Sequence, residues 1–154
     1  MTDLPTLGQM LGMQARLRPQ KIGVRDLERA MTFREWDRRA CRLANALLGL
    51  GLGKGDRVVV LAYNRVEWAE IYAATSKAGL VAVPLNFRLI AAEAAFILQD
   101  CGAAAVLAEH GLHEVIEAGR DCLALPPDRF IHFGAAVCPA GWRGYEDLLA
   151  RAAE

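Results

Sequence analysis

Apolar residues follow two spacings along this chain, and the alternation between them predicts a mixed α/β fold. Short uninterrupted apolar runs are typical of strands that are buried on both faces. Stretches in which apolar residues recur three and four positions apart indicate amphipathic helices. The predicted strands are 22–25, 29–33, 57–62, 80–85, 103–108 and 130–133. The predicted helices are 6–17, 32–50, 64–78, 91–101, 110–119 and 145–153.

Two of these helices begin with the same start signal. Thr32 and Glu35 have the spacing of a capping box, in which each side chain accepts a hydrogen bond from the backbone of the other residue. Asn64 and Glu67 repeat this spacing, so Asn64 is predicted to cap the helix that follows it. Both helices are therefore expected to begin at well-defined residues.

The glycine-rich stretch 51–56, GLGKGD, invites comparison with a phosphate-binding loop. Such a loop follows a strand and opens a helix, so that the helix N-terminus faces the phosphate. Here a predicted helix precedes the glycines and a predicted strand follows them. The stretch is therefore interpreted as a turn that ends the helix.

The order of the elements predicts the fold class. Strand 57–62, the next helix and strand 80–85 form one βαβ unit, whose strands should be parallel and whose crossover should be right-handed. The whole chain, 1–154, is predicted to be a single α/β domain with a mostly parallel sheet, helices on both faces and a short N-terminal hairpin. Residues 86–89 leave the carboxyl end of a strand, the edge at which open α/β sheets bind ligands.

Charge and composition exclude several classes of function. Eighteen basic side chains balance eighteen acidic ones, so neither nucleic acid nor an anionic membrane is an expected partner. The four cysteines show no spacing typical of zinc or of a disulfide scaffold, and reduced thiols are expected. The N-terminus lacks the features of a signal peptide, and no apolar stretch reaches the length of a membrane helix. A soluble cytoplasmic protein is expected.

Two groups of side chains resemble functional sites. His110 and His113 lie one helical turn apart and could both bind a metal, but no third ligand is evident from the sequence. They are interpreted as surface histidines, and no metal site is predicted. Arg38, Arg39 and Arg42 are interpreted as the solvated face of a helix.

With its elements laid out, the chain resembles the N-terminal part of adenylate-forming acyl-CoA synthetases over about residues 5–110. Each matching segment is weak alone, but their order is specific to this family. The segments are MTFREWDRRACRLANAL at 31–47, GLGKGDRVVVL at 51–61, the Asn64 and Glu67 pair, KAGLVAVPLNFRL at 77–89 and FILQDCGA at 96–103.

The resemblance implies an enzyme that activates a carboxylic acid, fatty or similar, with Mg-ATP and transfers the acyl group from AMP to coenzyme A. In the family, a Ser/Thr/Gly-rich loop holds the phosphates and a lysine of a C-terminal lid assists adenylation. Neither feature occurs in the 154 residues. The chain is therefore expected to be a segment of such a ligase that binds none of ATP, Mg²⁺ or coenzyme A tightly and contains no catalytic residue.

The resemblance also implies one binding residue. Arg88 matches an arginine that reaches a phosphate of coenzyme A in some ligases of the family, and a guanidinium suits that ligand. The alternative is a solvated loop arginine, or one paired with a carboxylate. At the cap of the next helix, relatives often have Thr or Ser where this chain has Ile90.

Two other functions remain open from the sequence. A stand-alone binding or assembly module without chemistry could associate with itself through apolar surface, as a homo-oligomer. A small doubly wound nucleotide-binding protein would need a glycine turn directly after a strand, and no such turn is found.

Overall fold

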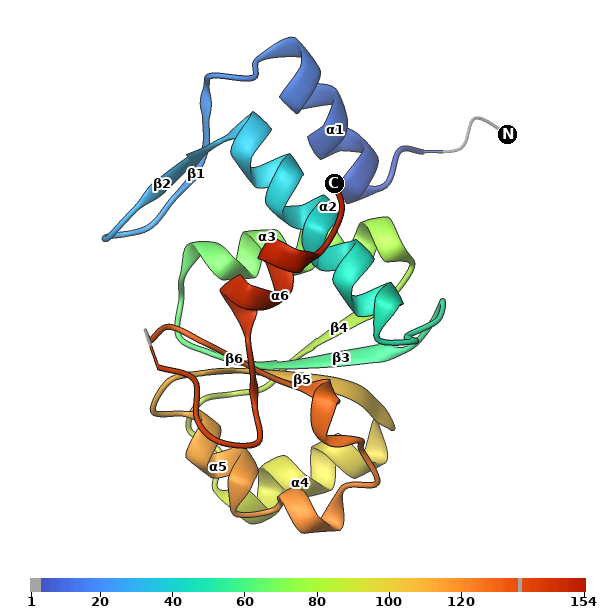
Figure 1. The fold of residues 1–154 in the computed structure, drawn as a ribbon, viewed down its shortest axis with the longest axis vertical. Coiled ribbons are helices and arrows are strands. Elements are labelled where there is room, and N and C mark those ends of the chain that lie inside the picture. The colour runs from blue at the N-terminus through green and yellow to red at the C-terminus, as the bar shows by residue number, and fades with distance from the viewer. Residues whose placement is uncertain (1–3, 136) are drawn as a thin grey trace. The chain divides into compact units, whose positions relative to one another are not determined.

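The computed structural model describes residues 4–135 and 137–154. All the helices and strands expected from the sequence are present, with ends that differ by a few residues (Figure 1). In chain order the elements are α1 Leu7–Leu17, β1 Ile22–Arg25, β2 Ala30–Thr32, α2 Phe33–Gly49, β3 Arg57–Leu61, α3 Val66–Ala78, β4 Val81–Pro84, α4 Ala91–Asp100, β5 Ala103–Glu109, α5 His113–Glu117, β6 Phe130–Phe133, β7 Arg143–Gly144 and α6 Tyr145–Arg151.

Five strands form one sheet in the order β4-β3-β5-β6-β7, and every neighbouring pair is parallel. The two remaining strands, β1 and β2, form an antiparallel hairpin. The prediction of an α/β fold with a mostly parallel sheet and a short hairpin is confirmed. Pro84 lies in β4 at the edge of the sheet, where its missing N–H removes no bond from a neighbour.

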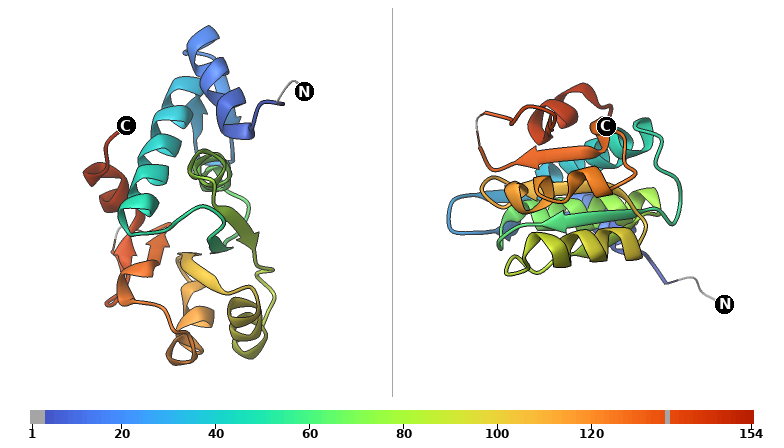
Figure 2. Two further views of the ribbon diagram at one scale, coloured as in Figure 1. Left: turned by 90° about the vertical axis from the view of Figure 1, so that its right-hand side faces the viewer. Right: turned by 90° about the horizontal axis from the view of Figure 1, so that it is seen from below.

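The chain divides into two compact units. One comprises the described residues up to Lys54 together with Asn64–Leu80 and Leu149–Glu154. The other comprises Gly55–Tyr63 and Val81–Leu148, and it contains the parallel sheet. Figure 2 gives two further views of the ribbon, coloured by residue number as in Figure 1.

In the unit that contains the sheet, α4 and α5 cover one face of the strands. Their side chains Leu98 and Ile116 pack with Val59, Val106 and Phe130 in one buried apolar cluster. The residues that alternate with these in β3 and β5, such as Val58 and Leu107, are also fully buried. Burial on both faces explains why these strands read as uninterrupted apolar runs.

The other unit contains α1, the hairpin, α2 and α3. Leu11, Ala40 and Ala73, one from each helix, meet in a small core beside Phe33 and Trp36. The Thr32 hydroxyl accepts a hydrogen bond from the Glu35 N–H, and the Glu35 carboxylate accepts one from the Thr32 N–H, so the predicted capping box is confirmed. The backbone at Gly51 and Gly55 is left-handed, which glycine adopts without strain, and the interpretation of this stretch as a turn is confirmed.

The predicted cap of α3 is wrong. Asn64 is exposed, the N-cap residue is Arg65, and its side chain makes no capping bond. The carboxylate of Asp26, in the β1–β2 turn, instead accepts a hydrogen bond from the Val66 N–H at 2.9 Å. Asp26 also accepts bonds from the N–H groups of Arg29 and Glu28. These backbone donors lower the pKa of Asp26 to about 2.

The interpretation of the α2 arginines as a solvated face is wrong for Arg39. Its guanidinium forms a two-pronged ion pair with Glu70 of α3, with Nε 2.7 Å from Oε1 and Nη2 3.1 Å from Oε2. The Glu70 side chain is fully buried, and Arg29 of the hairpin turn donates to it as well. Arg38 and Arg42 pair with the exposed carboxylate of Glu154.

No helix in the described part of the chain is both long and apolar enough to span a membrane.

Candidate functional site

Arg88 lies in a tight turn directly after β4, at the carboxyl edge of the sheet. The Asn86 side-chain oxygen accepts a hydrogen bond from the Arg88 N–H at 3.0 Å, and the Asn86 carbonyl accepts one from the Leu89 N–H at 3.1 Å. These two bonds hold the turn. The Arg88 side chain is exposed, and none of the ion pairs found among residues 4–135 and 137–154 involves it. Its charge is therefore available to a ligand.

Two aromatic rings lie beside Arg88 at the same edge. Tyr63, which follows β3, and Phe87 have ring centroids 4.9 Å apart and planes inclined by 54°. Both are close to half exposed. The Arg88 guanidinium carbon lies 5.5 Å from the centre of the Phe87 ring. The Glu109 carboxylate accepts a 2.7 Å bond from the Tyr63 N–H and so holds that segment in place. A cation beside exposed aromatic faces suits a ligand that carries phosphate and a flat ring.

The turn passes into α4 without a side-chain cap at Ile90. The Glu93 carboxylate accepts a hydrogen bond from the Ile90 N–H at 3.1 Å, so one half of a capping box is retained. The junction is therefore closed by the Glu93 side chain despite the missing hydroxyl.

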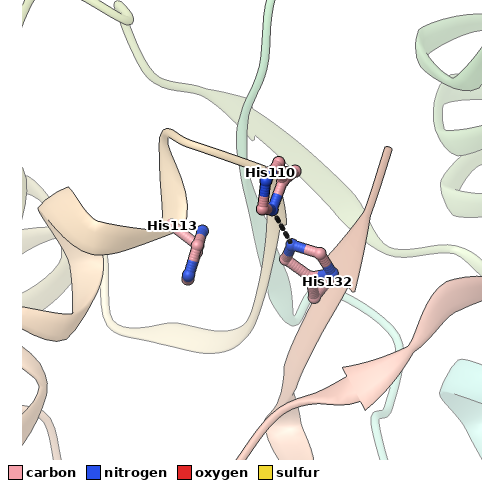
Figure 3. Close-up of side chains that lie close together, drawn as sticks. All are labelled: His110, His113 and His132. Carbon is pink, nitrogen blue, oxygen red and sulfur yellow. Dashed lines mark hydrogen bonds between the residues drawn. The ribbon is translucent and has the colours of Figure 1, made fainter. Parts of the chain in front are cut away.

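A second group of polar residues gathers at the carboxyl ends of β5 and β6. His110 directly follows β5, His113 is the first residue of α5, and His132 lies in β6 (Figure 3). One ring nitrogen of each lies within 4.8 Å of the other two. The interpretation of the first two as surface histidines is wrong for His113, which is 8% exposed. Sequence spacing missed His132 because β5–β6 pairing brings it to the site from a distant position.

The histidine cluster is densely packed. His132 is 1% exposed, and burial, followed by the neighbouring His113 and His110, lowers its pKa to about 4. Its imidazole is therefore neutral at neutral pH. The Trp142 ring lies nearly perpendicular to the rings of His113 and His132, with centroids 5.7 and 6.3 Å away. Nδ1 of His110 lies 3.3 Å from Nε2 of His132.

Comparison with known proteins identifies the family. Residues 11–135 match the model of the AMP-binding enzyme family. The chain is 34% identical over 141 residues to a fatty acid–[acyl-carrier-protein] ligase of Streptomyces coeruleorubidus, covering 92% of this chain and 26% of that protein. It is 37% identical over 119 residues to a long-chain-fatty-acid–CoA ligase of Mycobacterium tuberculosis, covering 76% of this chain and 24% of that one. The chain thus spans about a quarter of the length of these relatives.

Solved structures agree with this assignment. An anthranilate CoA ligase in complex with anthranoyl-AMP superposes with a TM-score of 0.90 at 27% identity, over 98% of this chain and 29% of that one. A benzoate CoA ligase from Burkholderia xenovorans shares the fold, with a TM-score of 0.85 over 97% of this chain and 29% of that one, at 23% identity. The chain therefore belongs to the AMP-binding enzyme family, in which it corresponds to the N-terminal part of an AMP-forming acyl-CoA synthetase.

Proposed function

We propose that this chain is the N-terminal part of a ligase that joins a carboxylic acid, fatty or similar, to coenzyme A. The reaction consumes ATP and passes through an acyl-adenylate, with Mg²⁺ bound to the phosphates. Family membership and the names of the relatives, which are ligases for fatty and aromatic acids, support this proposal. The described residues supply scaffold and one edge of the nucleotide-binding region.

Arg88 is the residue that carries the proposal within this chain. Its guanidinium is exposed, makes none of the ion pairs found in the described part of the chain, and stands beside two aromatic rings at the carboxyl edge of the sheet. We propose that it binds a phosphate of coenzyme A. Ligand binding at this edge is general for open α/β sheets, and a guanidinium fork matches a phosphate group.

The purified 154-residue chain is expected to show no carboxylate-dependent exchange between ATP and pyrophosphate. Stabilising the phosphates in the transition state needs a phosphate cradle and a positioned positive charge. The Ser/Thr/Gly-rich loop and the lid lysine that supply them in the family do not occur in the 154 residues. A complete ligase that carries this chain as its N-terminal part should catalyse the exchange. Exchange by the short chain at the rate of the complete enzyme would contradict the proposal.

In that complete ligase, Arg88→Ala should raise the KM for coenzyme A by about 10- to 100-fold, the size expected for losing a hydrogen bond to a charged group. The KM for ATP should change by less than about twofold, because the proposed contact is made to coenzyme A alone. Steady-state kinetics with each substrate varied in turn measure both values.

Arg34→Ala is the matched control, since Arg34 is also an exposed arginine, in α2, and makes none of the ion pairs found among the described residues. It should leave both KM values unchanged. Equal effects of Arg88→Ala on the KM for ATP and for coenzyme A would count against the phosphate contact.

A further inference from the structure

We propose that His110, His113 and His132 form a binding site for a divalent transition metal ion of the Zn²⁺ type. These are all the histidines of the chain, and the fold brings the three imidazoles to one place from three separate elements (Figure 3). Nothing in the proposed ligase reaction uses them.

The distances suit a tetrahedral metal site. Zinc binds imidazole nitrogen at about 2.0–2.1 Å, which separates two ligand nitrogens by about 3.3–3.4 Å in a tetrahedron. Nδ1 of His110 and Nε2 of His132 are 3.3 Å apart. All three ligand atoms lie within 4.8 Å of one another, so small rotations of the imidazole rings would bring the set to bonding distance.

The surroundings of the rings point to a ligand as well. His113 and His132 are both more than nine-tenths buried. Nδ1 of His113 is buried without a hydrogen-bond partner. A buried polar atom without a partner is unfavourable by about 1–3 kcal/mol, which a bound metal or a bridging water would relieve.

The backbone holds the ligands on rigid elements. The His110 N–H donates to the Phe133 carbonyl at 2.8 Å, which continues the β5–β6 ladder beyond the end of β5. His132 pairs with Ala108 in the same ladder. A metal at this position would join the ends of two strands to the first turn of α5. Such a site stabilises the folded state by mass action, because it does not exist in the unfolded chain.

The set of ligands selects the kind of metal. Three imidazoles without a carboxylate or thiolate favour Zn²⁺, Cu²⁺ or Ni²⁺ over Mg²⁺ and Ca²⁺, which prefer oxygen. Three protein ligands leave a fourth position for water, and the exposed ring of His110 gives access to it. The competing explanation is a metal-free cluster closed by the hydrogen bond between His110 and His132.

Zinc titration of the 154-residue chain distinguishes these explanations. Protein without an affinity tag, stripped of metal by a chelator and then dialysed, should bind one Zn²⁺ per chain in calorimetry. In long-range proton–nitrogen NMR spectra, the imidazole signals of all three histidines should shift together as zinc is added. The chain has only these three histidines, so their signals can be assigned without overlap from others. Mg²⁺ at the same concentration should cause no shift.

His110→Ala is the main variant, because His110 is exposed and its removal should leave the fold intact, as circular dichroism would check. It should weaken zinc binding at least about tenfold, the loss that even a supporting residue of a metal site produces. Zinc should raise the Tm of the unmodified chain but not that of His110→Ala. Cys122→Ser is the matched control. Cys122 is an exposed thiol outside the cluster, a side chain of a type that can bind zinc, and its replacement should leave zinc affinity unchanged.

The proposal is overturned if the unmodified chain binds no zinc, or if His110→Ala binds it as tightly as the unmodified chain. Loss of binding in Cys122→Ser with retention in His110→Ala would place the ion on a thiol instead.

Discussion

Replacing Arg39 with alanine is expected to lower the free energy of unfolding by about 3 kcal/mol. The substitution removes the two-pronged partner of Glu70, whose side chain is fully buried. A buried carboxylate that loses its partner retains the full penalty of desolvation, typically about 3–5 kcal/mol. Arg29 remains in contact with Glu70 and is expected to keep the loss near the lower end of that range.

Urea denaturation of the two proteins measures this difference. In thermal unfolding, the same loss corresponds to a fall in Tm of about 6–12 °C for a chain of this size. Arg38→Ala is the matched control, because Arg38 lies on the same helix and pairs with the exposed Glu154, and surface pairs contribute little. Equal stability of the Arg39→Ala and Arg38→Ala proteins would show that the buried pair is not a stabilising contact.

Truncation of Phe130 to alanine should destabilise the chain by about 3–5 kcal/mol, the usual effect of removing a buried aromatic ring. Phe130 is 1% exposed and packs in the cluster formed by the sheet with α4 and α5. Its ring lies edge-on to Trp142 at 5.6 Å between centroids, and the Arg120 guanidinium carbon lies 3.9 Å from its centre. The substitution removes both contacts and leaves a cavity in the core.

Phe96→Ala provides the control for this effect within the same unit, since Phe96 is a phenylalanine of α4 that is 67% exposed. Its truncation should change the free energy of unfolding by no more than about 0.5 kcal/mol. Equilibrium unfolding followed by circular dichroism measures both variants. A loss below about 1 kcal/mol for Phe130→Ala would mean that the cluster can close the cavity or that the ring contributes little packing energy.

The elements of this protein could be predicted from its sequence because the signals that specify them are local. Strands β3 and β5 are buried on both faces, so nearly every residue in each strand is apolar. Such an uninterrupted apolar run can be recognised within the segment itself. The capping box of α2 lies within four consecutive positions, so Thr32 and Glu35 suffice to mark where the helix begins. The end of β4 can also be predicted from local sequence, and Arg88, which comes shortly after it, is therefore expected at the edge of the sheet.

Contacts between distant segments were decided only by the tertiary structure. Asn64 has the spacing of a helix cap, yet Asp26 occupies that role. The hairpin turn brings the Asp26 carboxylate to the N–H of Val66, 40 positions further along the chain, at the start of α3. Arg39 has the position of a solvated residue on α2, but α3 places a buried carboxylate opposite it. Local spacing contains no information about a partner from another element.

The histidines show the same division most clearly. Spacing alone reveals His110 and His113 as a pair one helical turn apart and gives no reason to add a third. Parallel pairing of β5 with β6 places His132 level with Ala108, and so beside the end of β5, which converts two histidines into a cluster of three. The sequence by itself thus determined the elements and the family, because these depend on local patterns and on their order. Only the folded chain decided which side chains meet, because register and packing join residues that the sequence keeps apart.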